Sequence, residues 1–338
     1  MSSDTSFPEI QAVLVLPHIR VQNANAISSP MTWGFPAITA FTGLMTALER
    51  RLGRDAGIAF YGVGVICHAF EAQVTTADYT RAFHLTRNPV LADGGTPGIV
   101  EEGRVHLELT LVFDVQLAAA NRAAPERAAL VERVAHELAA MRIAGGSVIP
   151  ASLARPTPPV LELLADEAQD GERRKQFRRL AHSCLPGFAL VSRDDMLQAR
   201  LAELRSQDPA ATALDAWLDL SRWNVRAVEG PSKSDDESSS VVEWIGESRV
   251  GWTVPIPVGF AALSDLHAPG TVNRARDVST PFRFVETVWS MGQWVSPHRI
   301  ASLSHLVWST HHDPQHPSEH GLYRCRNHYK PATHNEPV

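Results

Sequence analysis

A run of polar and aromatic residues at positions 23–35, here called the polar loop, has the chemistry of a ligand-binding segment. Asn23, Asn25 and Ser29 carry short amide and hydroxyl groups that bond base edges, phosphates or the backbone of their own loop. Trp33 and Phe35 follow, and each ring has a face on which a nucleic-acid base can stack. Alternatively, the polar groups cap the loop while both rings enter the core. The residue types leave both interpretations open.

A second group, MRIAGGSV, places a guanidinium beside a glycine-rich turn, and residues 142–147 are here called the glycine motif. Arg142 precedes Gly145, Gly146 and Ser147. Glycines let backbone N–H groups approach a phosphate closely, and a guanidinium can fork onto the same phosphate. A helix stop followed by a tight turn explains the same residues without a ligand. The motif therefore predicts either a phosphate contact or a plain turn.

Three arginines in VNRARDVSTPFRFVE form a third candidate group. Arg274 and Arg276 point the same way if this segment is extended, so they can straddle adjacent phosphates. Arg283 follows in the same run. A surface salt bridge is the ordinary fate of an arginine beside a carboxylate, and Asp277 can neutralise one of the pair. We expect phosphate contacts here, with local charge pairing as the alternative.

A positive stripe is expected along one side of a helix near position 178. Residues three and four apart return to the same helical face. The basic members of this stripe are Arg174, Lys175, Arg178, Arg179 and His182. A solvated helix face explains such a stripe, whereas a patch for a nucleic-acid backbone or an acidic partner is the functional interpretation.

Catalytic, metal-binding and cofactor sites are not predicted. The sequence contains no HExxH, P-loop or paired acidic nuclease motif. A metal-independent ribonuclease needs a histidine with a serine or tyrosine partner within hydrogen-bond reach. Spacing does not show this reach for the histidines near predicted strands, which are His18, His68, His84 and His106. The carboxyl-terminal histidines lack an accompanying thiolate pair, so we expect no structural zinc there.

The overall charge restricts any nucleic-acid site to a local surface. The 338-residue chain has a formal net charge of −6, whereas nonspecific nucleic-acid binders are basic overall. It has no apolar run of about 18 residues, and MSSDTSFPEI is unlike a secretory signal. Cys67, Cys184 and Cys325 are widely spaced, which is typical of a reducing compartment. We therefore expect a cytoplasmic protein without a membrane partner.

Hydrophobic spacing predicts the elements that position these groups. Apolar residues recur every three to four positions in the segments expected to be helical, and alternate or run together in the expected strands. The expected order is a strand at 13–21 that bends at Pro17, a helix at 38–52, strands at 63–74 and 105–115, a helix at 125–141, and an extended segment after 146. This strand–helix–strand, strand–helix–strand order is typical of a ferredoxin-like or RRM-like domain.

The run QNANAISSPMTWGFPAITAFTG resembles the amino-terminal signature of a family in the type I-F CRISPR surveillance (Csy) complex. Members of this family cap the 5′ handle of the CRISPR RNA. Further blocks resemble the family in the same order, and these are FHLTRNPV, IVEEGRVHLELTL, MRIAGGSVIP, LPGFALVSRD, VPIPVGFAALS, ARDVSTPFRFVE and WVSPHRIASLS. The resemblance covers nearly the whole chain, and departs from the family near 232–240 and in the His-rich tail.

The resemblance implies an α+β fold with an RRM-like (ferredoxin-like) core, a thumb hairpin and a helical insertion. It implies that an excursion at about 80–103, here called the thumb, presses on the guide RNA and contributes Arg87 and Asn88. The implied partners are the RNA handle and the large and backbone subunits of the complex, with target DNA as a further candidate. RNA cleavage belongs to another subunit, so a non-catalytic role is implied.

Four segments follow from these expectations. They are a core at 1–150 that includes the thumb, a mainly helical insertion at 151–228 with helices at 161–182 and 194–223, a flexible linker at 229–247, and strands with a helix at 248–338 that return to the core before the His-rich tail. Two other functions stay open, namely a His-dependent CRISPR RNA endonuclease of related fold and a protein scaffold without RNA contact. Retained uncut RNA, cleaved repeat RNA and an RNA-free complex would distinguish the three.

Overall fold

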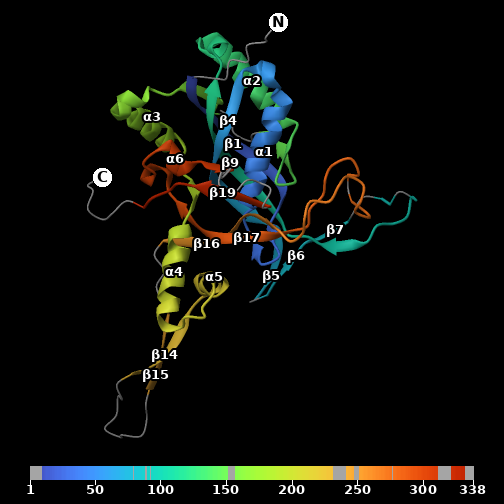
Figure 1. The fold of residues 1–338 in the computed structure, drawn as a ribbon, viewed down its shortest axis with the longest axis vertical. Coiled ribbons are helices and arrows are strands. Elements are labelled where there is room, and N and C mark those ends of the chain that lie inside the picture. The colour runs from blue at the N-terminus through green and yellow to red at the C-terminus, as the bar shows by residue number, and fades with distance from the viewer. Residues whose placement is uncertain are drawn as a thin grey trace.

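A large antiparallel sheet with helices around it organises the chain (Figure 1). The computed structural model describes residues 10–78, 80–87, 90–91, 93–150, 157–230, 241–246, 251–275, 277–310 and 321–331. Within these ranges the main sheet has 11 strands, and each pairing in it is antiparallel. The expected mixture of helices and strands is confirmed.

The first half of the chain follows the predicted alternation of strands and helices. Its main elements are β1 (Ile10–Asn25), α1 (Ile38–Leu52), β4 (Ile58–Ala72), β9 (Arg104–Leu117), α2 (Ala124–Ala139) and β11 (Gly146–Ile149). In the sheet these strands lie in the order β11-β1-β9-β4. Leu48 of α1 and Val134 of α2 share one buried cluster with Leu14 of β1, so both helices pack on the same sheet face.

Strand β1 is longer than predicted and runs through Pro17. On one edge it pairs with β9, and on the other with β12 (Val160–Leu163) and then β11. Pro17 lies between these two partners, at a register shift between Leu16 and Ile19. A bulge is where a sheet tolerates the missing N–H of proline. The predicted bend at Pro17 therefore corresponds to this irregularity.

Helix α1 buries the apolar face that its spacing predicts. Phe41, Leu48 and Leu52 are fully buried in the main core. The helix ends at Gly53, whose φ of 74° favours glycine because a side chain there would be strained. Arg50 and Arg51 in the last turn place positive charge at the negative end of the helix dipole. Packing and capping thus agree on where this helix stops.

Strands from the second half extend the sheet beyond β4 and close back onto it. In order of pairing from β4 they are β13 (Phe188–Ser192), β17 (Val285–Val295), β16 (Trp252–Ala262), β19 (Leu322–Asn327) and β18 (Trp308–Thr310). Because Trp308 of β18 is also paired with Val63 of β4, these strands form a closed ring. The buried Trp308 indole donates to the Leu190 carbonyl at 2.7 Å, which ties β18 to β13 inside that ring.

The segment predicted to be mainly helical also supplies strands β12 and β13 to the main sheet. Its helices are α3 (Asp170–Ser183), α4 (Asp194–Gln207) and α5 (Ala213–Ser221). The helix expected from 161 is therefore wrong at its start, because Leu161 is buried against β1 as a strand residue. The helix expected over 194–223 is interrupted, because Thr212 and Asp215 form a capping box that starts α5 anew. The short α6 (Leu303–Leu306) follows later in the chain.

Two hairpin projections extend away from the main sheet in different directions (Figure 1). In the first, β5 (Val74–Ala77), just before the thumb, pairs with β6 (Thr80–Phe83), and within the thumb β7 (Leu85–Arg87) pairs with β8 (Ile99–Glu101). The other projection consists of β14 (Val225–Gly230) paired with β15 (Val241–Gly246). The described parts of the predicted linker are therefore strands, while 231–240 and 247–250 lie outside the described residues.

No helix within the described ranges is long and apolar enough to cross a membrane. The same ranges contain no group of three or more histidine, cysteine, aspartate or glutamate side chains that could hold a metal ion. Much of the His-rich tail, at 311–320 and 332–338, lies outside the described residues. The three cysteines are free thiols.

Candidate nucleic-acid interface

The polar loop lies where β1, the thumb and the glycine motif meet. It folds as a small hairpin of β2 (Ile27–Ser29) and β3 (Thr32–Trp33). The Asn25 N–H donates to the Ala144 carbonyl of the glycine motif at 2.8 Å. The Ala26 N–H donates to the Gly103 carbonyl at the base of the thumb at 2.9 Å. The structure therefore brings together three segments that are far apart in the sequence.

The two asparagines of the polar loop have different roles. The Asn25 amide donates to the Ile27 carbonyl at 2.8 Å and accepts from the Ile27 N–H at 3.1 Å, so it holds its own loop. Asn23 has a left-handed φ of 58°, and its backbone N–H donates to His106 Nδ1 at 3.1 Å. Its exposed side-chain amide has no hydrogen-bond partner among the described residues. Asn23 is thus the asparagine that presents a free amide to solvent.

Ser29 is enclosed and does not present its hydroxyl to a ligand. The residue is 8% exposed, and its Oγ lies 2.6 Å from Thr32 Oγ1. It also accepts the indole N–H of Trp289 at 2.9 Å. The predicted RNA contact at Ser29 is therefore replaced by a structural role, in which the hydroxyl connects the polar loop to β17.

The two aromatic rings of the polar loop point to different environments. Phe35 is half-buried in the main core, stacked on Phe41 at 5.7 Å between ring centroids and edge-on to Trp294 at 4.9 Å. Trp33 is 41% exposed, and its ring centroid lies 6.0 Å from that of Phe83 in the thumb. The core interpretation thus applies to Phe35, whose stacking role is wrong, while Trp33 keeps an exposed aromatic face beside the thumb.

The glycine motif is a tight hairpin between β10 (Arg142–Ile143) and β11. Gly145 has a φ of 79° at the turn, and Ala144 before it has a φ of 48°. Arg142 and Ser147 are directly opposite across the hairpin and both are exposed. Arg142 has no ion-pair partner among the described residues, so its guanidinium and the Ser147 hydroxyl are neighbouring, available donors.

Gly146 serves a different purpose from the one its motif predicts. A Cβ at this position would lie 2.7 Å from the Ala24 backbone nitrogen and 2.8 Å from the Gln22 carbonyl oxygen. Gly146 is buried in the pairing of β11 with β1. Its missing side chain therefore lets these two strands approach each other, and a direct approach to phosphate is wrong for Gly146.

The three arginines of the third group do not form the predicted extended row. Arg274 is exposed in a turn with a left-handed φ of 60°, so the extended conformation expected there is wrong. Arg276 lies outside the described residues. Hydrogen bonds from Thr280 and Ser279 lower the pKa of Asp277 to about 2, so its carboxylate closes a local turn.

Arg283 is half-buried beside Gly321, in a segment of the chain that bridges Phe282 to His267. Its Nε is buried without a hydrogen-bond partner in the described parts of the chain. This orphaned donor keeps Arg283 as a candidate for a polar ligand, because a buried N–H is costly when it stays unpaired.

The thumb places Arg87 at the end of β7 with its side chain exposed, while Asn88 lies outside the described residues. Sequence reasoning missed Arg104 at the thumb base. Its guanidinium contacts the Glu102 carboxylate at 2.7 Å and the Asn23 carbonyl at 3.5 Å. The EEGR run carried a signal for this pair, since it places two glutamates within three positions of the arginine.

The basic stripe on α3 is largely paired with acids. Arg174 contacts Asp170 at 2.8 Å, and Lys175 lies 3.8 Å from Glu172. Both pairs are exposed, so they stabilise the helix only slightly. Together they favour the solvated-face interpretation of this stripe.

Comparison with known proteins decides the family. The family model for the CRISPR-associated protein Csy2 matches residues 14–325. The chain is also 47% identical over 323 residues to the CRISPR-associated protein Csy2 of Pseudomonas aeruginosa (strain UCBPP-PA14), covering 94% of this chain and 96% of that protein. The chain belongs to the Csy2 family of CRISPR-associated proteins. The resemblance to the type I-F family is therefore confirmed.

The matched region of the Csy2 family includes the polar loop, the thumb and the glycine motif. It also includes a histidine cluster that the sequence did not reveal. His18 Nδ1 lies 2.7 Å from Glu108 Oε1, and the His18 ring stacks on His68 at 4.4 Å between centroids. His68 Nε2 lies 2.7 Å from Thr110 Oγ1, while its Nδ1 lies 2.6 Å from the Pro186 carbonyl.

The irregular backbone of β1 explains why this cluster could not be found from spacing. His18 sits in the register shift after Leu16 and has a left-handed φ of 51°. Strict strand alternation therefore predicts the wrong direction for the His18 side chain. The Thr110 hydroxyl accepts the His18 backbone N–H at 3.2 Å, which fixes this conformation.

We expect acid to destabilise the fold through His68. Burial lowers the pKa of His68 below its ordinary 6.5, and the nearby His18 acts in the same direction, although the Pro186 carbonyl opposes the shift. The unfolded chain then binds this proton more readily than the folded chain does. The contribution of neutral His68 to the free energy of unfolding is complete above about pH 6.5 and is lost as the pH falls below that value.

Urea unfolding at about pH 7.5 and about pH 5.5 measures this effect. His68→Gln should flatten the dependence of the unfolding free energy on pH, leaving the part due to His305, whose pKa burial also lowers. An equally steep dependence in His68→Gln would contradict the assignment.

Proposed function

We propose that this Csy2-family protein is a non-catalytic RNA-binding subunit of a type I-F CRISPR surveillance complex that caps the 5′ handle of the guide RNA. The observation that carries the proposal is the junction of the polar loop, the thumb and the glycine motif. There the Asn23 amide, the Trp33 ring and the Arg142 guanidinium are all exposed. The amide can bond a base edge, the ring can stack on a base, and the guanidinium can bind a phosphate, which together suit single-stranded RNA.

The arrangement of the first half supports an RRM-like, ferredoxin-like core. The element order β1-α1-β4-β9-α2-β11 and the sheet order β11-β1-β9-β4 are those of a split βαβ domain. The closed ring of later strands is an elaboration on its β4 edge. In this proposal the core displays the RNA handle at the strand end from which the polar loop and the glycine motif extend.

The proposal assigns the partners and the compartment as well. The protein pairs with the large subunit and with backbone subunits of the complex, in the cytoplasm, and target DNA is a further candidate ligand. Guide pairing supplies sequence specificity for the target, while this subunit recognises RNA shape and handle bases.

The proposal is tested by coexpression with the other complex subunits, followed by identification of the RNA that co-purifies. This RNA should be retained uncut, and the same RNA with a fluorescent label should bind the purified protein. Arg142→Gln should lower the slope of log affinity against log salt by about 0.7, the value for one phosphate contact on a single strand.

A matched control for this experiment is Arg54→Gln. Arg54 is exposed in a 3-10 turn (Arg54–Ala56) and has no ion-pair partner in the described chain, so its loss removes the same charge away from the junction. This variant should keep the wild-type slope. Equal slopes in wild type and Arg142→Gln would remove Arg142 from the site, and a complex without RNA would favour a protein scaffold.

A His-dependent RNA endonuclease is the second candidate, because the structure gives His18 a carboxylate partner at 2.7 Å. Such a pair orients an imidazole as a general base. Against it, the only hydroxyl that the cluster holds within hydrogen-bond distance in the described residues, Thr110, is 1% exposed and already bonded to His68. Cleavage of repeat RNA that disappears in His18→Ala would establish this candidate in place of the first.

A further inference from the structure

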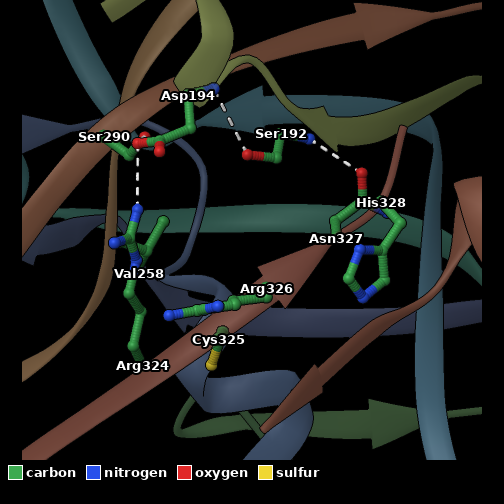
Figure 2. Close-up of a pocket in the computed structure, with 9 residues that line it drawn as sticks. All are labelled: Ser192, Asp194, Val258, Ser290, Arg324, Cys325, Arg326, Asn327 and His328. Carbon is green, nitrogen blue, oxygen red and sulfur yellow. Dashed lines mark hydrogen bonds and ion pairs between the residues drawn. The ribbon is translucent and has the colours of Figure 1, made fainter. Parts of the chain in front are cut away.

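A cavity of about 300 Å³ lies among strands of the closed ring, and its lining residues belong to neither the polar loop, the thumb nor the glycine motif. Its walls come from the ends of β13 and α4 and from β16, β17 and β19 (Figure 2). Ser192, Asp194, Ser290, Arg324 and Arg326 are among the residues that line it. The cavity is therefore polar and contains more basic than acidic side chains.

Two arginines of β19 reach into this cavity (Figure 2). They are two residues apart, so they project from the same face of the strand, about 6.6 Å apart along it. The Arg324 guanidinium contacts Asp194 Oδ1 at 2.9 Å, and the same carboxylate oxygen accepts the Ser290 hydroxyl at 2.8 Å. One carboxylate therefore compensates Arg324 and is held in place by Ser290.

Arg326 has no such compensation. The residue is exposed, and its guanidinium has no ion pair or hydrogen bond with any described residue. The Arg324 Nε is buried and also lacks a hydrogen-bond partner in the described chain. The cavity thus contains an unpaired guanidinium and an orphaned N–H, both of which an anionic oxygen would satisfy.

The basic character continues along the chain beyond β19. His328 and Lys330 are exposed and follow Arg326 at the same two-residue spacing, and His328 lines the cavity. Tyr323, Cys325 and Asn327 alternate with them, and Cys325 is buried against Thr42 of α1. Basic side chains that recur along the chain beside the cavity match an extended polyanion better than they match one carboxylate.

We propose that this cavity and the basic row Arg324, Arg326, His328 and Lys330 bind the phosphodiester backbone of a single-stranded nucleic acid, with one phosphate held between Arg324 and Arg326. The planar guanidinium forks suit phosphate oxygens in a bidentate arrangement. The inference rests on the proposed function for its ligand class, but it concerns a different surface from the polar-loop junction. Guide RNA and target DNA share this chemistry, and the experiment distinguishes them.

The test uses the full chain, with fluorescently labelled oligouridylate RNA and oligothymidylate DNA as probes in anisotropy titrations. Arg326→Gln removes the uncompensated charge without disturbing the Asp194 pair, and Arg54→Gln is the matched control. We expect Arg326→Gln to weaken binding by about five- to tenfold and to lower the salt slope by about 0.7, with no change in melting temperature. Arg326→Lys should recover the salt slope but only part of the affinity, because a lysine ammonium does not make the bidentate hydrogen bonds of a guanidinium.

Each outcome has a distinct meaning. Loss of RNA affinity alone identifies guide RNA as the ligand, loss of DNA affinity alone identifies target DNA, and loss of both identifies the shared backbone chemistry. Unchanged affinity in Arg326→Gln, or an equal loss in Arg54→Gln, overturns the inference while the proposed function stands. A wild-type chain that binds neither probe also overturns the inference, whereas the proposed function is decided by the co-purified RNA. A polyglutamate peptide that binds wild type but not Arg326→Gln, with nucleic-acid affinity unchanged, overturns the inference in favour of an acidic protein partner.

Discussion

Trp33→Ala is expected to weaken RNA binding by about 1–3 kcal/mol while leaving the stability of the fold nearly unchanged. The ring is 41% exposed and tilted toward Phe83, so its removal takes away a stacking face at the surface without creating a core cavity. Affinity measured by anisotropy and stability measured by urea unfolding, on the same variant, test both parts. Trp33→Phe should recover much of the affinity, since a smaller ring still stacks.

Phe35→Ala is the matched control for Trp33→Ala. Phe35 packs against Phe41 and Trp294, so its loss should cost about 3 kcal/mol of unfolding free energy through a cavity. RNA affinity per folded molecule should stay close to wild type. If Trp33→Ala instead unfolds the protein and leaves affinity per folded molecule unchanged, the stacking role of Trp33 is wrong.

The contrast between these neighbouring rings shows what the sequence could and could not predict. The periodicity of α1 was sufficient to locate the helix and its buried face, because the contacts that stabilise a helix lie within a few residues. Phe35 packs edge-on against Trp294, which lies in β17, a strand far from Phe35 in the sequence. Residue type alone gives both rings the same burial tendency, so only the tertiary pairing separates them.

Ser29 shows the same limit for polar groups. Its bond to Trp289 joins residues that are 260 positions apart, and no local pattern reports such a contact. Likewise, closure of the ring depends on the pairing of β18 with β4, which brings distant segments together. Arg274 departs from the prediction for a different reason, because its turn has a left-handed residue where extended alternation was expected.

The glycine motif forms the turn that one of its two interpretations predicted, but the roles of its glycines needed the structure. Gly145 has the positive φ that favours glycine, and the space where its Cβ would lie is open. Gly146 has no unusual φ, yet its Cβ would collide with the backbone of β1. In the sequence the two positions are indistinguishable, because both conformational freedom and close approach select glycine.

Gly146→Ala is accordingly expected to destabilise the protein by about 3 kcal/mol, the upper part of the range for an added methyl in a tight site. The new Cβ would lie 2.7 Å from the Ala24 nitrogen and 2.8 Å from the Gln22 oxygen, and neither backbone atom can move without separating β11 from β1. The free energy of unfolding, from urea denaturation, measures this loss.

Gly145→Ala should cost only about 1 kcal/mol, because its penalty is the left-handed backbone alone. Equal losses in the two variants would mean that β11 relaxes away from β1 at no greater cost than a strained turn. RNA binding adds a second readout, since the pairing of β11 with β1 is what places Arg142 and Ser147 beside the polar loop. Folded Gly146→Ala should therefore bind RNA more weakly than folded Gly145→Ala, because only the former displaces both donors from Asn23.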